Sequence, residues 1–179
     1  MTLATSKIFL RRVLFLIILQ PVIAYAQSES DNTSPDSELL NFESWSVQCV
    51  RQQASEQRAC FMYQPIFLKD GQRLLLFRVQ KNVPMSDGAS AADIAVITVP
   101  LGVHLPSGIA LQIDDNNPIS FAYERCDQGG CFSGAVLEDD LLSALKSGTA
   151  CKLSFNDLSG QTITATLSLK GFTKAYNSM

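Results

Sequence analysis

Residues 162–170 read Thr-Ile-Thr-Ala-Thr-Leu-Ser-Leu-Lys, and this stretch is decisive for the fold class. Ile163, Ala165, Leu167 and Leu169 alternate with threonine, serine and lysine. Successive side chains of a β-strand point to opposite faces, so this strand has one apolar and one polar face. Such a strand is typical of an antiparallel sheet that covers a core on one side and meets water on the other.

The same two-residue alternation recurs along most of the chain, for example at 45–49 and 109–113. Turn-forming residues separate the alternating segments, among them Asp70-Gly71 and the cluster 115–118. We expect strands at 45–49, 61–68, 73–81, 93–99, 109–113, 119–123, 131–137, 152–156 and 162–170.

One short helix is expected near residues 139–147. Asp139 and Asp140 would begin it, Lys146 lies near its end, and Gly148 follows. The sequence shows no internal repeat and no regular alternation of strands with helices. Many short strands with regular turns therefore predict an all-β fold, an antiparallel β-sandwich or a barrel.

Composition limits the classes of protein to consider. The chain has 179 residues, of which 46% are hydrophobic and 17% charged, and its formal net charge is −3. This length suits one domain, and this composition excludes disorder along the whole chain. No basic run occurs beyond the first dozen residues, which argues against nucleic acid as a partner.

The N-terminal segment has the pattern of a secretory signal peptide. Three basic residues precede an apolar run at 13–23, and Ala24-Tyr25-Ala26 then places small residues at −3 and −1 of a cleavage site. The run is shorter than the ~20 residues that span a bilayer, which disfavours an uncleaved anchor. We expect cleavage between Ala26 and Gln27, and no membrane span after it.

Cleavage would leave an acidic leader in front of the domain. It would remove Lys7, Arg11 and Arg12, so that 11 basic and 17 acidic residues remain and the net charge becomes −6. That charge argues against an anionic membrane surface as partner. Residues 27–41 are rich in acidic and polar side chains, which favours disorder. The alternating pattern begins at Phe42, so one β-sandwich domain is expected over 42–176.

The five cysteines all follow the expected cleavage site. In an oxidising compartment disulfides are the ordinary outcome, and four paired cysteines allow three connectivities. Cys126 and Cys131 flank a Gly-Gly pair that suits a tight hairpin, and Cys49 and Cys60 flank a polar segment between two apolar ones. The spacing therefore favours two local pairs.

Cys151 differs from the other four cysteines. It shares an apolar strand face with Leu153 and Phe155, so we expect a free, buried thiol, with intermolecular pairing as the alternative. No C-x-x-C motif is present and no cysteine has a histidine near it in sequence. A redox or metal-binding use of the thiols is therefore disfavoured.

Three other segments are weighed as sites. His104 is the single histidine and lies between two prolines, which favours a structural or solvent-facing role. Residues 114–117 are oxygen-rich but lack the spacing of a calcium loop, so a turn is expected. Asn82–Ala92 is small and polar, a modest candidate interface whose alternative is a plain linker. No G-x-S-x-G, phosphate loop or H-E-x-x-H motif occurs.

Four local signatures, taken in order, resemble the invasion-associated locus B family of exported Gram-negative bacterial proteins. The resemblance covers roughly residues 42–176, and its most specific parts are the second and the last signature. The signatures are Trp45-Ser-Val-Gln-Cys49 with Cys60, Val99-Pro-Leu-Gly-Val-His-Leu-Pro-Ser-Gly-Ile109, Tyr123-Glu-Arg-Cys126 with Gly130-Cys131, and Leu167-Ser-Leu-Lys-Gly-Phe172 with Thr-Lys-Ala.

The resemblance implies an immunoglobulin-like β-sandwich, export across the inner membrane, and no assigned enzymatic activity. The family name reflects an association with host-cell invasion in some members. The family pattern carries four cysteines that match Cys49, Cys60, Cys126 and Cys131, and none that matches Cys151.

We therefore expect an exported, non-catalytic interaction domain of the bacterial envelope, periplasmic or secreted, with an envelope or host protein as partner. No catalytic, cofactor-binding or metal-ligating residue is expected. The alternatives are a periplasmic hydrolase or thiol redox enzyme, and a structural envelope component. The sequence leaves the partner's identity and the oligomeric state open.

Overall fold

The computed structural model describes residues 37–51, 58–85, 88 and 90–179. The expected signal peptide at 1–26, its cleavage site and the leader as far as residue 36 lie outside these residues. In the described part, all the strand pairs of the named strands are antiparallel, and they form two sheets that enclose one hydrophobic core. This is the expected antiparallel β-sandwich.

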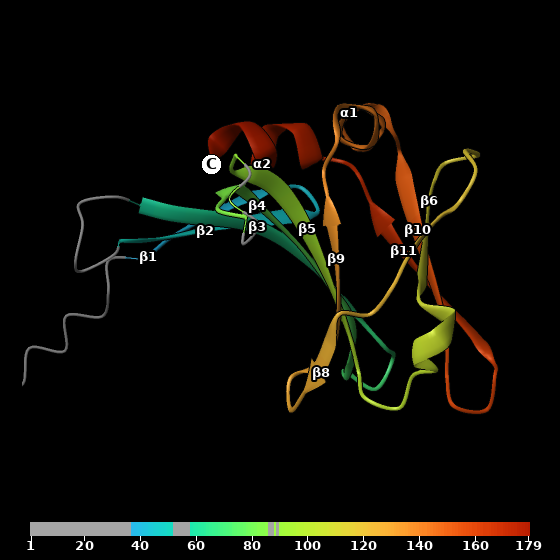
Figure 1. Cartoon of the computed structure of the whole chain (residues 1–179). Coiled ribbons are helices and arrows are strands. Elements are labelled where there is room, and N and C mark those ends of the chain that lie inside the picture. Colours follow the sequence, from blue (N-terminus) through green and yellow to red (C-terminus); the bar gives the residue numbers. More distant parts are fainter. Residues whose placement is uncertain (1–36, 52–57, 86–87, 89) are drawn as a thin grey trace, which may run out of the picture. The chain divides into compact units, whose positions relative to one another are not determined.

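The larger sheet has seven strands in the order β1-β2-β3-β4-β5-β9-β8 (Figure 1). Its first five strands form a meander, in which each strand pairs antiparallel with the next strand in the sequence. The bounds are β1 (Ser37–Phe42), β2 (Trp45–Arg51), β3 (Arg58–Phe67), β4 (Arg73–Val83), β5 (Ala92–Val99), β8 (Arg125–Asp127) and β9 (Gly130–Val136).

The smaller sheet has four strands in the order β11-β10-β6-β7. The chain enters it after β5 through the 3₁₀ turn η1 (Leu105–Ser107), returns to the larger sheet after β7, and enters it again through α1. The bounds are β6 (Ile109–Ile113), β7 (Ile119–Phe121), β10 (Ala150–Asn156) and β11 (Thr162–Ser168). The alternation at 162–168 buries Ala165 and Leu167 and exposes Thr162, Thr164 and Thr166.

Two α-helices accompany the sheets at the same end of the domain (Figure 1). The expected helix is present as α1 (Asp139–Ser147), whereas α2 (Phe172–Ser178) has no counterpart in the sequence-based expectations. α2 begins directly after Gly171, which has φ +87° and whose added Cβ would lie 2.1 Å from the carbonyl oxygen of Phe42. Only glycine fits this close approach without strain.

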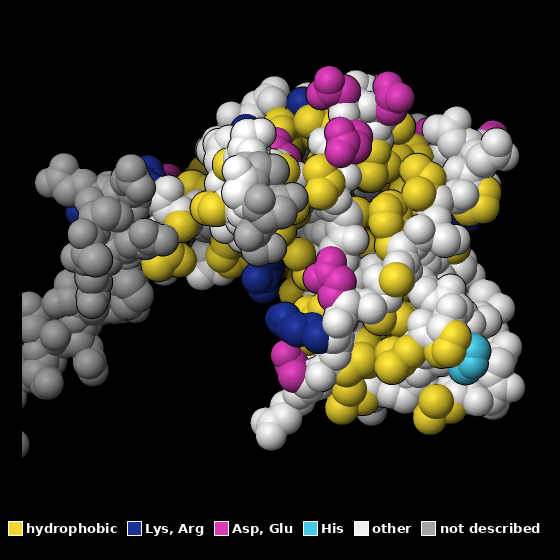
Figure 2. All heavy atoms as spheres, viewed as in Figure 1, with side chains coloured by type: hydrophobic (Ala, Val, Ile, Leu, Met, Phe, Trp, Pro, Cys, Tyr) yellow, Lys and Arg dark blue, Asp and Glu magenta, His cyan; other side chains and the backbone are white. Residues whose placement is uncertain are grey.

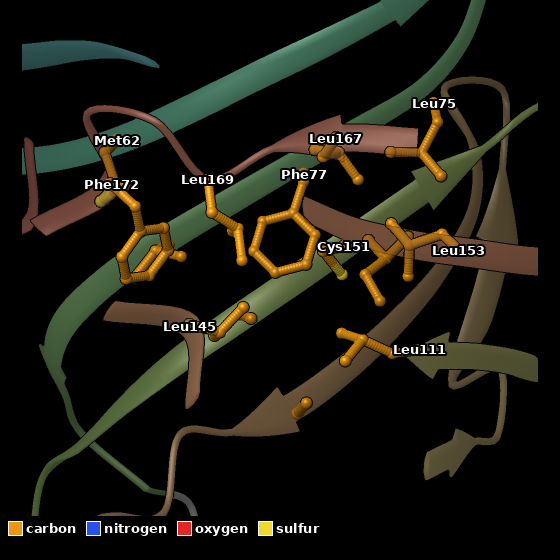
Figure 3. Packing of buried hydrophobic residues seen from close by; sticks show 14 of the residues in the cluster. Met62, Leu75, Phe77, Leu111, Leu145, Cys151, Leu153, Leu167, Leu169 and Phe172 are labelled. Carbon is orange, nitrogen blue, oxygen red and sulfur yellow. The ribbon is translucent and has the colours of Figure 1, made fainter. Parts of the chain in front are cut away.

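The core is built from both sheets and both helices. Trp45 is 1% exposed and makes edge-to-face contacts with two rings. The distance between ring centroids is 5.8 Å to Phe77 and 5.0 Å to Phe172. Leucines of α1, β10 and β11 fill the space between these rings and the smaller sheet (Figure 3). α2 thus closes the core around the single tryptophan.

One buried amide joins the two sheets. Gln64 of β3 is 5% exposed, and its Nε2 donates to the carbonyl oxygens of Ser44 and Ser168 at 2.8 and 3.0 Å. Its Oε1 accepts from the backbone N–H of Ser168 at 3.0 Å. Trp45 Nε1 donates to the same Ser168 carbonyl at 3.0 Å. The end of β11 is therefore bound to the larger sheet through side chains.

The N-terminal boundary expected at residue 42 is wrong by five residues. β1 starts at Ser37, pairs along β2, and places Leu40 and Phe42 against the core. Glu38 of β1 also forms an ion pair with Arg58. Pairing with β2 satisfies the backbone of this segment, so its acidic and polar composition does not keep residues 37–41 disordered.

Candidate functional site

Four of the five cysteines form the two local disulfides favoured by the spacing. Cys49 faces Cys60 across β2 and β3, and Cys126 faces Cys131 across β8 and β9. Each bridge joins directly opposed residues of an antiparallel pair, so it staples a hairpin.

Cys151 is a free thiol in the core. It is 1% exposed and lies in the layer that holds Phe77 and Leu153 (Figure 3). Burial, and then the negative charge of Asp114, raise the pKa of the Cys151 thiol to about 12. A protonated and enclosed thiol is a poor nucleophile and metal ligand.

His104 lies in the loop before η1 and is exposed, coloured cyan in Figure 2. Its Nδ1 lies 2.6 Å from Ser107 Oγ, which also accepts from Asn156 Nδ2 at 3.3 Å. A serine next to a histidine is the pairing that hydrolases use. Here the two are three residues apart across one 3₁₀ turn, so the contact closes that turn and fits the expected structural role.

The oxygen-rich segment 114–117 is a turn between β6 and β7, as expected. The Asp114 carboxylate accepts hydrogen bonds from the backbone N–H groups of Ala150 and Thr149, which lower its pKa. Asp114 has φ +47° and ties this turn to the start of β10. Within the described residues, no group of three or more His, Cys, Asp or Glu is arranged to hold a metal ion.

The candidate interface Asn82–Ala92 is shorter than expected, because its ends belong to β4 and β5. Ser86, Asp87 and Ala89 lie outside the described residues. The backbone N–H of Asn82 donates to Asp93, whose carboxylate also accepts from the hydroxyl of Tyr176 in α2. Lys81 and Lys146 each place an ammonium 4.1 Å from the Tyr176 ring. This end of the hairpin therefore anchors α2.

A recessed surface lies on the outer face of the larger sheet. We call it the outer groove; its volume is about 350 Å³. β3 supplies an aromatic and proline floor, and β2 and β4 supply the polar and basic sides. The groove is lined by Gln48, Phe61, Tyr63, Pro65, Phe67, Arg73, Leu76 and Arg78.

The outer groove combines exposed aromatic rings with cations. Phe67 is 58% exposed, and the rings of Phe61 and Tyr63 lie 5.8 Å apart at the surface. The Arg78 guanidinium lies 4.7 Å from the centre of the Phe61 ring. Arg73 also lines a second hollow of about 310 Å³ beside the β8–β9 turn. Such a mixture of aromatic and arginine side chains is enriched at protein interfaces.

The outer groove was not among the sites expected from the sequence, although one signal for it is present. The segment 61–68 reads Phe-Met-Tyr-Gln-Pro-Ile-Phe-Leu and is apolar or aromatic at nearly every position. A strand with one wet face usually alternates with polar residues. The outward positions 61, 63, 65 and 67 are all aromatic or proline, so this outer face is not an ordinary solvated one.

Comparison with models of protein families identifies the family of this chain. Residues 45–179 match the model of the family described as invasion associated locus B protein. The chain belongs to this family. The match begins at Trp45 and includes β2 to α2, so it covers both disulfides, both helices and the outer groove.

Individual relatives agree with the family match. Invasion protein B homologs of two Brucella abortus strains, 2308 and 9-941, are each 30% identical over 156 residues, which is 86% of this chain and 84% of theirs. The crystal structure of invasion associated protein B from Bartonella henselae aligns with a TM-score of 0.66 and 23% identity, covering 79% of this chain and 94% of that one. This structural match shows that the chain and the Bartonella henselae protein share a fold.

Proposed function

We propose that this protein is an exported, non-catalytic domain of the bacterial envelope that binds another protein through the outer groove. The observation that carries the proposal is the groove itself, where the aromatic ring of Phe67 stays 58% exposed beside Phe61, Tyr63 and two arginines. Aromatic side chains left in water on a sheet face are characteristic of interaction sites.

Two further observations, the N-terminal sequence pattern and the relatives' names, support individual parts of the proposal. Export is supported by the basic region, apolar run and A-x-A site within residues 1–26. Of the helices in the described part of the chain, none has the length and apolar character needed to cross a membrane. The relatives' names, which call them invasion proteins, motivate a link to host-cell invasion.

The non-catalytic part rests on the state of the reactive groups. Four thiols are in disulfides, and the fifth is buried with a raised pKa. Ser107 hydrogen-bonds to His104 within its own turn. A fluorophosphonate probe, which labels activated serines, should leave the purified domain unlabelled. Labelling that disappears in Ser107→Ala would instead favour the hydrolase alternative.

Site-specific photocrosslinking in the native bacterium tests the binding role. A benzoylphenylalanine at Phe67 should give a discrete crosslinked protein, whereas the same group at the exposed Thr166 on the smaller sheet should not. Mass spectrometry of the same cells should find a mature chain that begins at Gln27. Crosslinks at Thr166 but not at Phe67 would contradict the groove, and a retained Met1 would contradict export with cleavage.

A further inference from the structure

We infer that the outer groove takes an extended polypeptide segment of the partner whose groove-facing side chains are apolar over β3 and acidic beside Arg73 and Arg78. The inference rests on the proposed binding function and adds the chemistry of the partner. It depends on three features of the groove: the spacing of the aromatic floor, the two arginines beside it, and the hollow that continues it.

The floor has the repeat of an extended chain. Phe61, Tyr63, Pro65 and Phe67 follow one another on the outer face of β3 at every second residue. Two residues of a strand advance about 6.6 Å, which is also the distance between alternate side chains of an extended peptide. A segment lying along β3 can therefore place one apolar side chain over each gap in this ladder. From Phe61 to Phe67 the ladder is about 20 Å long, which suits a segment of about seven residues.

The two arginines on the β4 side of the groove select acidic side chains at the groove-facing positions nearest to them. Arg73 and Arg78 are exposed, and no acidic residue lines the groove. The ion pairs of the described residues join Arg58 to Glu38, Arg125 to Asp127 and Lys174 to Glu43, so they use neither groove arginine. Arg78 stacks on Phe61 and keeps its planar fork of donors for a carboxylate.

The protein as a whole carries the opposite charge, which restricts the class of partner. The net charge is −3, and the acidic Asp139 and Asp140 lie in α1, where the acidic side chains gather in Figure 2. A long polyanion would meet repulsion beyond the groove. Separate carboxylates on a polypeptide need only the two local guanidinium groups, so they fit better than a nucleic acid or a sulfated glycan.

The segment can continue past the end of β3. Phe67 pairs in register with Arg73, and Arg73 also lines the second hollow with Thr98, Leu101 and Gly130. Leu101 is 60% exposed there. The arginine therefore lies between two recessed, partly apolar surfaces, where a single carboxylate could be held with apolar neighbours on both sides.

Selection from a random library of displayed 12-residue peptides tests the inference. The bait is the purified domain, and selection is repeated with the double variant Arg73→Gln/Arg78→Gln. The matched control is Lys152→Gln/Lys170→Gln, which removes two exposed cations away from the outer groove, one on β10 and one in the turn after β11. We expect peptides in which Asp or Glu and Phe, Tyr or Leu occur together at every second position, so that both kinds of side chain share one face of the extended chain. Their affinity, measured by fluorescence anisotropy, should fall about tenfold or more in the arginine variant and remain unchanged in the lysine variant.

Thermal unfolding of the variants separates binding from folding, since the substituted side chains are exposed and Tm should not change. Selection of peptides without acidic residues, equal binding by the arginine variant, or heparin binding that depends on the arginines without any peptide enrichment would overturn the inference. If Phe67 still crosslinks to a protein in cells, the binding function stands and only the partner chemistry fails. If no crosslink forms at Phe67, the proposed site itself fails.

Discussion

The two faces of the larger sheet are built from the same strands, yet they differ in almost every property. On the inner face Trp45, Met62 and Phe77 are at most 1% exposed. On the outer face Phe61 and Tyr63 are half-buried and Phe67 is 58% exposed. A shift of one residue along a strand exchanges the two faces. The residues that stabilise the core therefore alternate with those of the proposed binding surface, and substitutions can test the two roles separately.

The largest expected effect comes from the inner face. Trp45→Ala should lower the free energy of unfolding by about 3–5 kcal/mol, because it leaves a cavity beside Phe77 and Phe172 and removes a hydrogen bond to Ser168. Urea unfolding followed by circular dichroism measures this, since Trp45 is the only tryptophan and its fluorescence is lost.

The matched outer-face variant is Phe61→Ala. It should lower the free energy of unfolding by less than Trp45→Ala does, because Phe61 is only half-buried and leaves no enclosed cavity, while weakening the binding of any ligand of the outer groove. Equal destabilisation by the two variants would remove the distinction between the faces.

The next largest effect concerns the bridge at Cys49, which lies on the inner face. Cys49→Ala/Cys60→Ala opens a loop with a sequence separation of 11, and the chain-entropy model gives a loss of roughly 3 kcal/mol. Cys126→Ala/Cys131→Ala, with a separation of 5, should lose roughly 2 kcal/mol. Non-reducing peptide mapping checks the pairing first; a peptide that joins Cys151 or Cys126 to Cys49 would contradict it.

Gln64 is a buried polar residue on the otherwise apolar inner side of β3, and its substitution gives the next prediction. Gln64→Ala leaves the backbone groups of Ser168 and the carbonyl of Ser44 without their partner, so we expect a loss of about 2 kcal/mol. The neighbouring Tyr63→Ala, which points to the outer face, is the control and should cost less. Chemical denaturation of the two variants at the same pH measures this difference. An equal or smaller loss for Gln64→Ala would show that its hydrogen bonds do not stabilise the fold.

Cys151 gives a smaller and chemically specific effect. With a pKa raised to about 12, its thiol should not react with dithiobis-nitrobenzoate at pH 8 until the domain is unfolded in urea. Cys151→Ser should destabilise by about 1–2 kcal/mol, because a hydroxyl enters an apolar site. Rapid reaction of the native protein would show that the core is open to solvent beside β10.

The smallest effect depends on pH and lies outside both faces. The backbone N–H groups of Ala150 and Thr149 lower the pKa of Asp114 in the folded state. The ionised carboxylate therefore stabilises the fold at pH values above its unfolded pKa of about 4, and this stabilisation is lost as the pH falls through the lower folded pKa. Asp114→Asn keeps a residue that tolerates φ +47°. Its Tm should be lower than wild type at pH 7 and converge with it below pH 4, whereas Asp115→Asn should show no such convergence.

The inner face could be predicted from the sequence because burial leaves a periodic signal. The alternation at 45–49 and 162–168 predicted which residues face the core, and the hairpin spacing of the cysteines favoured the pairs that the structure contains. α2 and β1 were missed for a physical reason. α2 is short and is held by a residue far away in the sequence, Trp45, whereas β1 is polar and is held by pairing with the adjacent strand β2.

The outer groove could not be predicted in the same way. Its residues come from β2, β3 and β4, and their proximity depends on strand register, such as Tyr63 opposite Arg78. Register is set by the pairing of whole strands and by the bulge after Ile66, which a local pattern does not reveal. The sequence alone pointed instead to the loop at 82–92, because flexible composition is easier to recognise than a built surface.

The position of Trp45 also has a consequence for the order of events in folding. It is the first residue of β2, yet its hydrogen-bond partner Ser168 lies 123 residues further along, and Phe172 lies beyond that. A chain emerging from its N-terminus therefore cannot complete this core until nearly all of it is available. Until β11 and α2 are present, Trp45 therefore lacks its hydrogen-bond acceptor and one of its aromatic neighbours.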